Sequence, residues 1–473
     1  MGLSWFSLVP FLIVISMAIW LKNILPGLVL GLLAGSLLVK GNILDGIYQS
    51  VSYIVATLSN GNNIKIIAFL YLFGGLVGMM NISGGIKGFS EWIGTKIQTE
   101  RGLLGFIWLT LPFTFMMPMF RIMMIGPVVK SLIKKINVPK QKVGLTMDIS
   151  TESVIVLLPV ATAFVGFMVS LVGGSLQKLH VGMSPYQVFL LSLLFNFFAI
   201  VMLAIGVIRT YVASANKTSE PSDHPQLEQA ENELHRSGIR RELSMVKAQP
   251  WNLIFPVLLL LGLTFYLLWQ NGTAKGAVTL AKAFSLADAT FVMLLAVFIT
   301  IILTCIFYII RQQPLGELLY HFFDGGNQMM EAISLLVLIW SMTLSAEELG
   351  FSTFIRLTLG TFLPAYLTPV AIFLLGAFIS YFLGSSWGTW GLFMPLGISL
   401  AVSTGASIPL TVGAVFASGA FGALASPLGD TTITTASILD LVLVDYARYK
   451  LKISVIGAAI ASGLYIVAAL FIF

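Results

Sequence analysis

Long hydrophobic runs separated by short polar stretches make up most of this chain of 473 residues. Most runs are close to the roughly 20 residues that a helix needs to cross a bilayer. The pattern therefore predicts an all-α polytopic membrane protein with about 10–12 transmembrane helices. The longer runs lie near residues 4–21, 25–39, 64–80, 103–119, 153–175, 185–212, 252–269, 288–310, 329–346, 366–383, 409–425 and 452–473.

Shorter apolar pieces, interrupted by glycine and proline, lie near residues 84–98, 112–135, 352–363 and 386–403. Both residue types break helices, so these pieces are too short or too broken to cross cleanly. Non-helical backbone survives at membrane depth only where protein buries it or where it lines a watery cavity. We therefore expect broken helices and re-entrant hairpins, which are typical of secondary transporters.

Composition supports this class. Hydrophobic residues make up 57% of the chain and charged residues 10%, against about 25% charged in a soluble domain. The net charge of +6 is spread over short loops, which fits a multi-pass protein of the bacterial inner membrane and not a nucleic-acid binder. The lone Cys305 excludes a disulfide framework. With no HExxH and no P-loop, we expect neither zinc proteolysis nor ATP-driven pumping, and no enzyme.

One segment is plainly aqueous. Residues 214–250 form a polar, mixed-charge linker that we expect on the cytoplasmic side. It divides the chain into two transmembrane halves, residues 1–213 and 251–473.

The two halves resemble each other in the spacing of their prolines. Three prolines of each half line up, and the first and third of them are 32 residues apart in both halves. These are Pro127, Pro139 and Pro159, and Pro395, Pro409 and Pro427. Five lysines lie between residues 130 and 142, whereas the matching loop 401–408 has no charge. The positive-inside rule places such loops on opposite faces, which predicts two inverted-topology repeats.

The second half carries two patches of small and hydroxyl-bearing residues, 384–391 (GSSWGTWG) and 426–432 (SPLGDTT). Carbonyls, hydroxyls and a carboxylate are the ligands that a hard cation prefers. We predict a Na⁺ site with Asp430, Thr431 and Ser386 as ligands. Ser385, Thr389 and Thr432 are further candidates. Two alternatives stay open: a role of Asp430 as a helix cap only, and a role of the serine and glycine patch in helix packing.

The first half adds its own candidates. Asp148 and Glu152 are four residues apart and share one face of a helix, next to Ser150 and Thr151. They could carry protons or assist the cation site, because carboxylates inside a membrane are functional by default. Asp148 could instead be an interfacial helix cap.

Arg121 falls opposite Thr389 when the halves are aligned on their prolines. It could replace a second cation or hold a substrate carboxylate. It could equally snorkel from the end of a span.

The segments 384–389 (GSSWGT), 413–416 (GAVF) and 426–432 (SPLGDTT), together with 142–151 in the first half, resemble the NhaC family of sodium/proton antiporters. The resemblance covers most of the chain outside the linker and the extreme termini. That family usually has an acid where this chain has Ala423, and it also includes sodium-coupled carriers of organic acids and amino acids.

These observations predict a secondary transporter, a Na⁺/H⁺ antiporter in which both ions compete for an intramembrane carboxylate. The alternative is a Na⁺- or H⁺-coupled carrier of a small organic acid or amino acid. We expect no cofactor, with Na⁺ and H⁺ as the transported or coupling ions. The expected partners are membrane lipid, a small cation and, in the alternative, an organic solute, but no nucleic acid. Both a monomer and a homodimer stay open.

Overall fold

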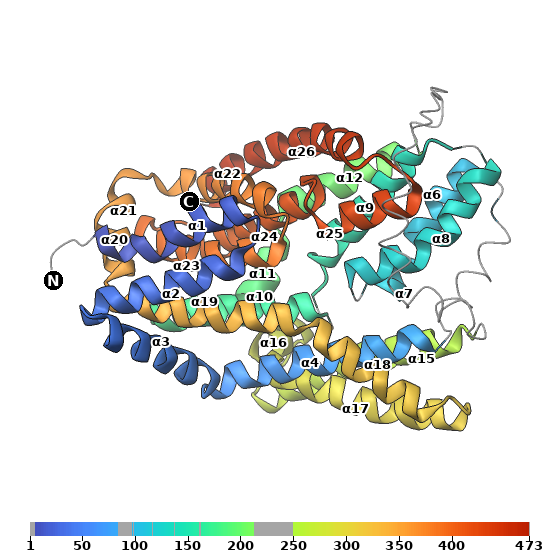
Figure 1. Cartoon of the computed structure of the whole chain (residues 1–473), viewed down its shortest axis with the longest axis horizontal. Coiled ribbons are helices and arrows are strands. Elements are labelled where there is room, and N and C mark those ends of the chain that lie inside the picture. Colours follow the sequence, from blue (N-terminus) through green and yellow to red (C-terminus); the bar gives the residue numbers. More distant parts are fainter. Residues whose placement is uncertain are drawn as a thin grey trace.

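The computed structural model describes residues 5–83, 97, 99–115, 117–136, 138–159, 162–211 and 249–472. Almost all of the linker and the expected broken piece near 84–98 lie outside the described residues. Within these ranges, the described chain is built from helices (Figure 1).

Glycine, proline and polar caps divide the apolar sequence into separate helices. The helices of the first half are α1 (Val9–Leu21), α2 (Ile24–Lys40), α3 (Ile43–Leu58), α4 (Gly61–Ile82), α6 (Glu100–Leu109), α7 (Leu111–Thr114), α8 (Pro118–Ile136), α9 (Lys140–Ile155), α10 (Ala163–Lys178), α11 (Pro185–Leu193) and α12 (Phe197–Tyr211). Those of the second half are α15 (Trp251–Ala274), α16 (Leu280–Leu286), α17 (Ala289–Ile310), α18 (Leu315–Gln328), α19 (Met330–Glu348), α20 (Phe351–Leu357), α21 (Leu359–Phe362), α22 (Thr368–Leu383), α23 (Ser386–Thr404), α24 (Ile408–Ala425), α25 (Asp430–Leu439) and α26 (Leu443–Ile472).

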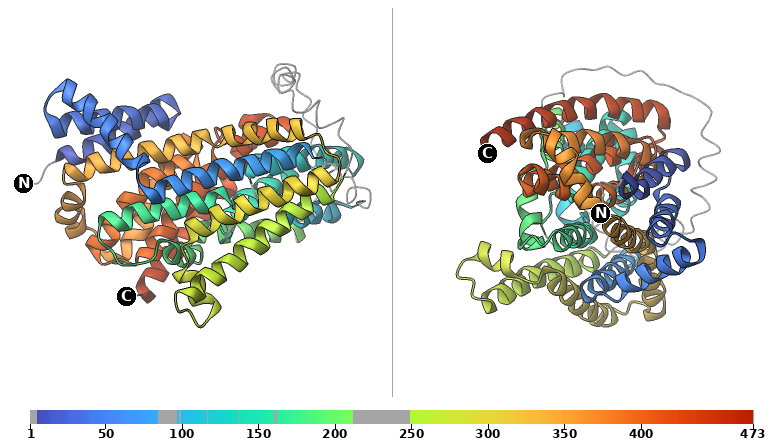
Figure 2. Two further views of the ribbon diagram at one scale, coloured as in Figure 1. Left: turned by 90° about the horizontal axis from the view of Figure 1, so that it is seen from below. Right: turned by 90° about the vertical axis from the view of Figure 1, so that its left-hand side faces the viewer.

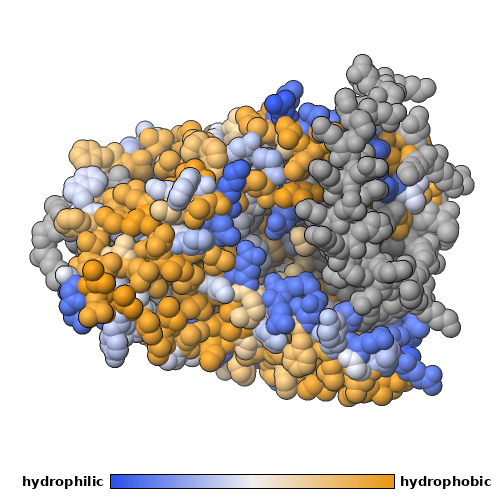
Figure 3. Space-filling model, viewed as in Figure 1, coloured by the Kyte–Doolittle hydropathy of each residue, from blue (hydrophilic) through white to orange (hydrophobic). Residues whose placement is uncertain are grey.

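Eight helical segments of the described chain are long and apolar enough to cross a membrane, and three shorter apolar helices accompany them. The long segments include Ala289–Ile310 and Leu443–Phe471, and the shorter helices include Ala163–Lys178. Apolar side chains cover most of the left-hand part of the face in Figure 3, and hydrophilic ones gather toward the right. The prediction of a polytopic all-α membrane protein is confirmed.

The repeat seen in the prolines extends to the helix boundaries. Three helices of the second half begin 268 residues after their counterparts: α22 and α6 (368 and 100), α23 and α8 (386 and 118), and α24 and α9 (408 and 140). α8 lies toward the right-hand end of the molecule and α23 toward the left-hand end (Figure 1). The halves are therefore two copies of one helical pattern, placed toward opposite ends.

The two copies interlock by reciprocal contacts. α8 packs on α25 of the other half, and α23 packs on α10, which is the equivalent pairing. In the same way α4 packs on α17 and α18, while α19 packs on α2 and α3. The helix α4 runs alongside α17 and α18 near the lower edge of the molecule in Figure 1, and the left-hand view of Figure 2 shows this edge from below. Such reciprocity is what a two-fold relation between repeats produces. The equivalent helices α9 and α24 contact each other at the centre.

Candidate functional site

Helix α9 is buried on all sides although it is rich in polar residues. Every residue from Val143 to Ser153 is buried. Polar side chains in such a place need partners, and intramembrane acids mark functional sites. The buried polar residues of α9 are Thr146, Asp148, Ser150, Thr151, Glu152 and Ser153.

The Asp148 carboxylate lies at the centre of a buried polar cluster formed by three helices. Lys450 of α26 forms an ion pair with it, and the side chains of both residues are 0% exposed. The Thr435 hydroxyl of α25 donates a hydrogen bond to Oδ1 at 2.5 Å. The Tyr446 hydroxyl donates to Oδ2 at 2.7 Å. Asp148 is thus not an interfacial cap but a fully buried and fully paired acid.

Lys450 also donates to the Thr432 hydroxyl at 2.7 Å, so its ammonium bridges α9 and α25. The sequence analysis missed Lys450, Tyr446 and Thr435. A signal was present, because Tyr446 and Lys450 are four residues apart and share a helix face. Arg448 and Lys452, on the same helix, are exposed, so basic residues alone could not single out Lys450.

Glu152 lies one turn beyond Asp148 and has a different environment. Its side chain is only 4% exposed, and it lies beside Thr431 of α25. The buried Thr431 hydroxyl faces the Glu152 carboxyl and forms no other hydrogen bond within the described residues. Glu152 is also close enough to Asp148, Asp430 and Lys450 for their charges to act on it. No ion pair to Glu152 is formed within the described chain.

Asp430 occupies the first position of α25 and is exposed. Gly429 is the N-cap residue, without a side-chain cap hydrogen bond, so Asp430 is not the N-cap. It forms no ion pair with another residue of the described chain. A carboxylate in the first turn is favoured by the helix dipole. The structure therefore brings Asp430 and Thr431 to Glu152, with Asp430 on the accessible side.

The two small-residue patches of the second half meet at their breaks. Gly384 has φ of +66° and ends α22, and a Cβ added there would lie 2.7 Å from the backbone of Leu428. Ser385 caps α23 by accepting from the Gly388 amide at 3.4 Å. Only a residue without a side chain permits this approach of two chain breaks.

The hydroxyls at this tip are used within the protein. Ser386 donates to the Gly419 carbonyl of α24 at 3.1 Å. Thr389 donates to the Ser385 carbonyl at 2.9 Å. Both side chains are buried, so their lone pairs, rather than their protons, are what they could offer to a cation.

Arg121, at the start of α8, does not snorkel to the surface. It is 1% exposed and donates five hydrogen bonds, all to uncharged oxygens. The acceptors are Thr151 Oγ1 at 3.0 Å, Thr110 Oγ1 at 3.0 Å, Thr114 Oγ1 at 2.6 Å, the Ile107 carbonyl at 2.6 Å and Ser150 Oγ at 3.1 Å. Ser150 and Thr151 thus face Arg121 of α8.

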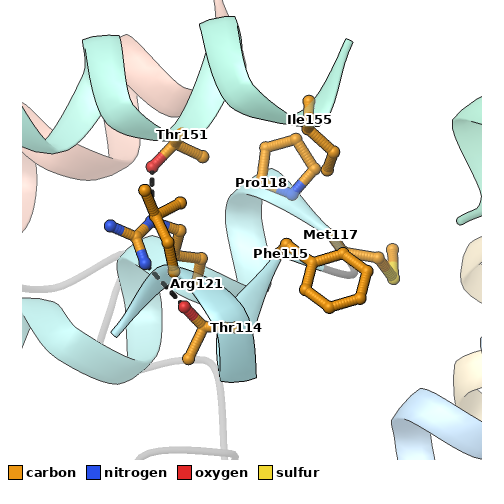
Figure 4. A pocket seen from close by; sticks show the side chains of 8 residues that line it. Thr114, Phe115, Met117, Pro118, Arg121, Thr151 and Ile155 are labelled. Carbon is orange, nitrogen blue, oxygen red and sulfur yellow. Dashed lines mark hydrogen bonds between the residues drawn. The ribbon is translucent and has the colours of Figure 1, made fainter. Parts of the chain in front are cut away.

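Beside Arg121 lies a narrow gap that has no room for a water molecule. Figure 4 shows the guanidinium bonded to Thr114 and Thr151 on one side of it. Phe115, Pro118 and Ile155 form the apolar side. The Arg121 guanidinium is therefore a buried cation that has no carboxylate partner among the described residues.

Two known proteins are similar to this chain in sequence. The chain is 25% identical to an uncharacterized protein of Haemophilus influenzae over 478 residues, covering 98% of this chain and 91% of that one. It is 35% identical over 156 residues, 31% of each chain, to the arginine/ornithine antiporter ArcD of Halobacterium salinarum.

Two solved structures share the fold. MtrF of Neisseria gonorrhoeae, described as one of a class of antimetabolite efflux pumps, has a TM-score of 0.59 at 13% identity and covers 90% of this chain and 85% of its own. The YdaH transporter of Alcanivorax borkumensis has a TM-score of 0.58 at 12% identity, covering 89% and 88%. The model of the Na⁺/H⁺ antiporter family matches residues 154–469. The chain is therefore a multi-pass secondary transporter and belongs to the Na⁺/H⁺ antiporter family.

Proposed function

We propose that this protein exchanges Na⁺ for H⁺ across the bacterial inner membrane, with Glu152, Thr431 and Asp430 holding the cation. The observation that carries the proposal is the contrast between two acids on one helix. Asp148 is compensated by Lys450, whereas Glu152 is also buried and forms no ion pair with a basic residue of the described chain. A buried carboxylate without a partner is costly unless it is protonated or bound to a cation.

The choice between a bound proton and a bound cation at Glu152 couples the transport of the two ions. A carboxyl that carries a proton cannot also be a ligand of Na⁺, so each ion displaces the other from Glu152. The Thr431 hydroxyl supplies a neutral oxygen beside the acid, and hard cations prefer oxygen ligands. Asp430 is exposed and lies where an arriving cation would meet negative charge before it reaches Glu152. Movement of one repeat against the other would expose the site alternately.

The test uses everted membrane vesicles with an imposed ΔpH. Glu152→Gln keeps the size of the side chain but removes its negative charge and its exchangeable proton. We expect Na⁺-dependent dissipation of ΔpH to fall to the level of vesicles without the protein. Glu331→Gln, at an exposed position of α19, is the control and should leave the dissipation unchanged. Full activity of Glu152→Gln would remove Glu152 from the mechanism.

A second candidate is coupled transport of a small organic acid or amino acid. Two observations favour it: Arg121 is a buried cation without a carboxylate partner in the described chain, and 156 residues resemble an arginine/ornithine antiporter. In this alternative a substrate carboxylate replaces some of the hydroxyls around Arg121. Uptake of labelled amino acids and carboxylates by proteoliposomes under a Na⁺ gradient separates the two candidates. Na⁺/H⁺ exchange without solute accumulation excludes the second.

A further inference from the structure

We propose that the ammonium of Lys450 permanently fills a second cation position of this protein, built from Asp148 and Thr432. The protein therefore binds one fewer Na⁺ than its oxygens could hold. The Nζ atom lies between Asp148 Oδ2 and Thr432 Oγ1 and donates to both. A carboxylate and a hydroxyl are also the ligands that a bare monovalent cation would use.

Two hydroxyl groups of this cluster keep the Asp148 carboxylate in place when the Lys450 ammonium is replaced. Thr435 and Tyr446 donate to Asp148 from α25 and α26, so two hydrogen bonds orient the carboxylate independently of Lys450. The Tyr446 ring centroid lies 5.1 Å from Nζ, which is within the range of cation–π attraction. Asp148, Thr432 and Lys450 are all 0% exposed, so bulk water cannot compensate the carboxylate.

The equivalent position in the other repeat shows that a cation site is not a general property of the repeat. Displacing Asp148 and Thr435 by the repeat distance gives Phe416 and Phe167. Trp390 of α23 packs against both rings, with centroids 5.7 Å and 6.4 Å away. An aromatic cluster has no oxygen ligands to offer, so the polar position exists once, and Lys450 occupies it.

The position of Lys450 predicts what happens when its ammonium is removed by substitution. Lys450→Met keeps an unbranched apolar stem but removes the ammonium, which leaves Asp148 as a buried and uncompensated carboxylate. Such a charge recruits a cation when one is small enough to enter. The variant should therefore bind one more Na⁺ per chain than the wild type, and its thermal stability should become dependent on Na⁺.

The experiment measures equilibrium binding of radioactive Na⁺ to the full-length purified protein, together with melting in Na⁺ and in choline. We expect Lys450→Met to gain one Na⁺ and to melt at a higher temperature in Na⁺ than in choline. The double variant Asp148→Asn with Lys450→Met removes both charges and should return to the wild-type number. Lys452→Met, an exposed lysine two residues further along α26, is the matched control and should bind as the wild type does.

Two outcomes would overturn the proposal. One is a Lys450→Met variant that binds the wild-type number of Na⁺. The other is a Lys450→Met variant with the same melting temperature in Na⁺ and in choline, since Na⁺ would then be unable to replace the ammonium. The number of Na⁺ ions bound per wild-type chain tests the proposed function, because a wild-type protein that binds no Na⁺ counts against the Glu152 site. The difference between variant and wild type tests only the role of Lys450.

Discussion

Buried ionisable side chains around α9 stand in three different electrostatic environments. Asp148 has an ion pair and two hydroxyl donors. Arg121 has only uncharged acceptors, but it satisfies all five of its N–H groups with them. Glu152 has no ion pair within the described chain. At the residue scale, the least compensated group is the one expected to exchange ions, and the compensated groups are expected to hold the architecture in place.

The bonding of Arg121 leads to a prediction on stability. Arg121→Gln should destabilise the protein by about 2–4 kcal/mol, because several buried hydroxyls lose a charged donor at once. The measurement is a shift of the melting temperature in detergent. Arg101→Gln changes the same residue type at an exposed position of α6 and should have little effect. Equal melting of both variants would show that the five hydrogen bonds do not contribute to stability.

At the scale of the helices, the breaks between consecutive helices determine where the site residues lie. The start of α8 places Arg121 against α9, and the break between α24 and α25 places Asp430 and Thr431 beside Glu152. The break before α23 touches the break before α25 through Gly384 and Leu428. The site is thus assembled where helices begin and end, because only there can chain segments approach closely and leave oxygens free.

This contact between two breaks can be tested with a pair of glycine variants. Gly384→Ala should destabilise by about 2–4 kcal/mol, since it adds left-handed backbone strain and an overlap with the Leu428 backbone. Gly405→Ala has the same kind of conformation, with φ of +78°, but nothing lies within 4 Å of the added atom. It should cost only about 1 kcal/mol.

Melting temperatures and vesicle transport measure the difference between the two glycine variants. A similar loss in both would mean that backbone strain, and not the meeting of the two breaks, governs this region.

The whole molecule consists of two interlocked copies of one helical pattern that carry different side chains. One copy supplies Asp148, Glu152 and Arg121, and the equivalent positions of the other hold Phe416, Ala420 and Thr389. The repeated architecture therefore provides the two-fold framework for movement, while the chemistry is concentrated on α9, α25 and the start of α26. A charged site needs to be built only once if the framework presents it to both sides in turn.

The inverted orientation of the two copies predicts opposite accessibility of equivalent loops. After replacement of Cys305 by alanine, Lys140→Cys at the start of α9 and Ser407→Cys before α24 can be labelled with a membrane-impermeant maleimide. We expect Lys140→Cys to react only in everted vesicles and Ser407→Cys only in right-side-out vesicles. Permeabilised vesicles provide the control, in which both should react. Labelling of both cysteines from the same side would refute the inverted arrangement.

Local features of the chain were enough to predict the membrane class, the family and the repeat, because hydrophobic length, short motifs and proline spacing can be seen without a fold. They also singled out Asp430, Asp148 and Glu152 as acids among apolar residues. How these acids differ became visible only in the folded protein. Lys450 lies 302 residues after Asp148, and which of three neighbouring basic residues turns inward depends on the packing of α26 against α9 and α25. Arg121 is likewise buried and fully hydrogen-bonded only because α6, α7 and α9 and the residue between α6 and α7 supply its acceptors. Compensation of a buried charge depends on side chains from distant segments, and the fold alone brings them together.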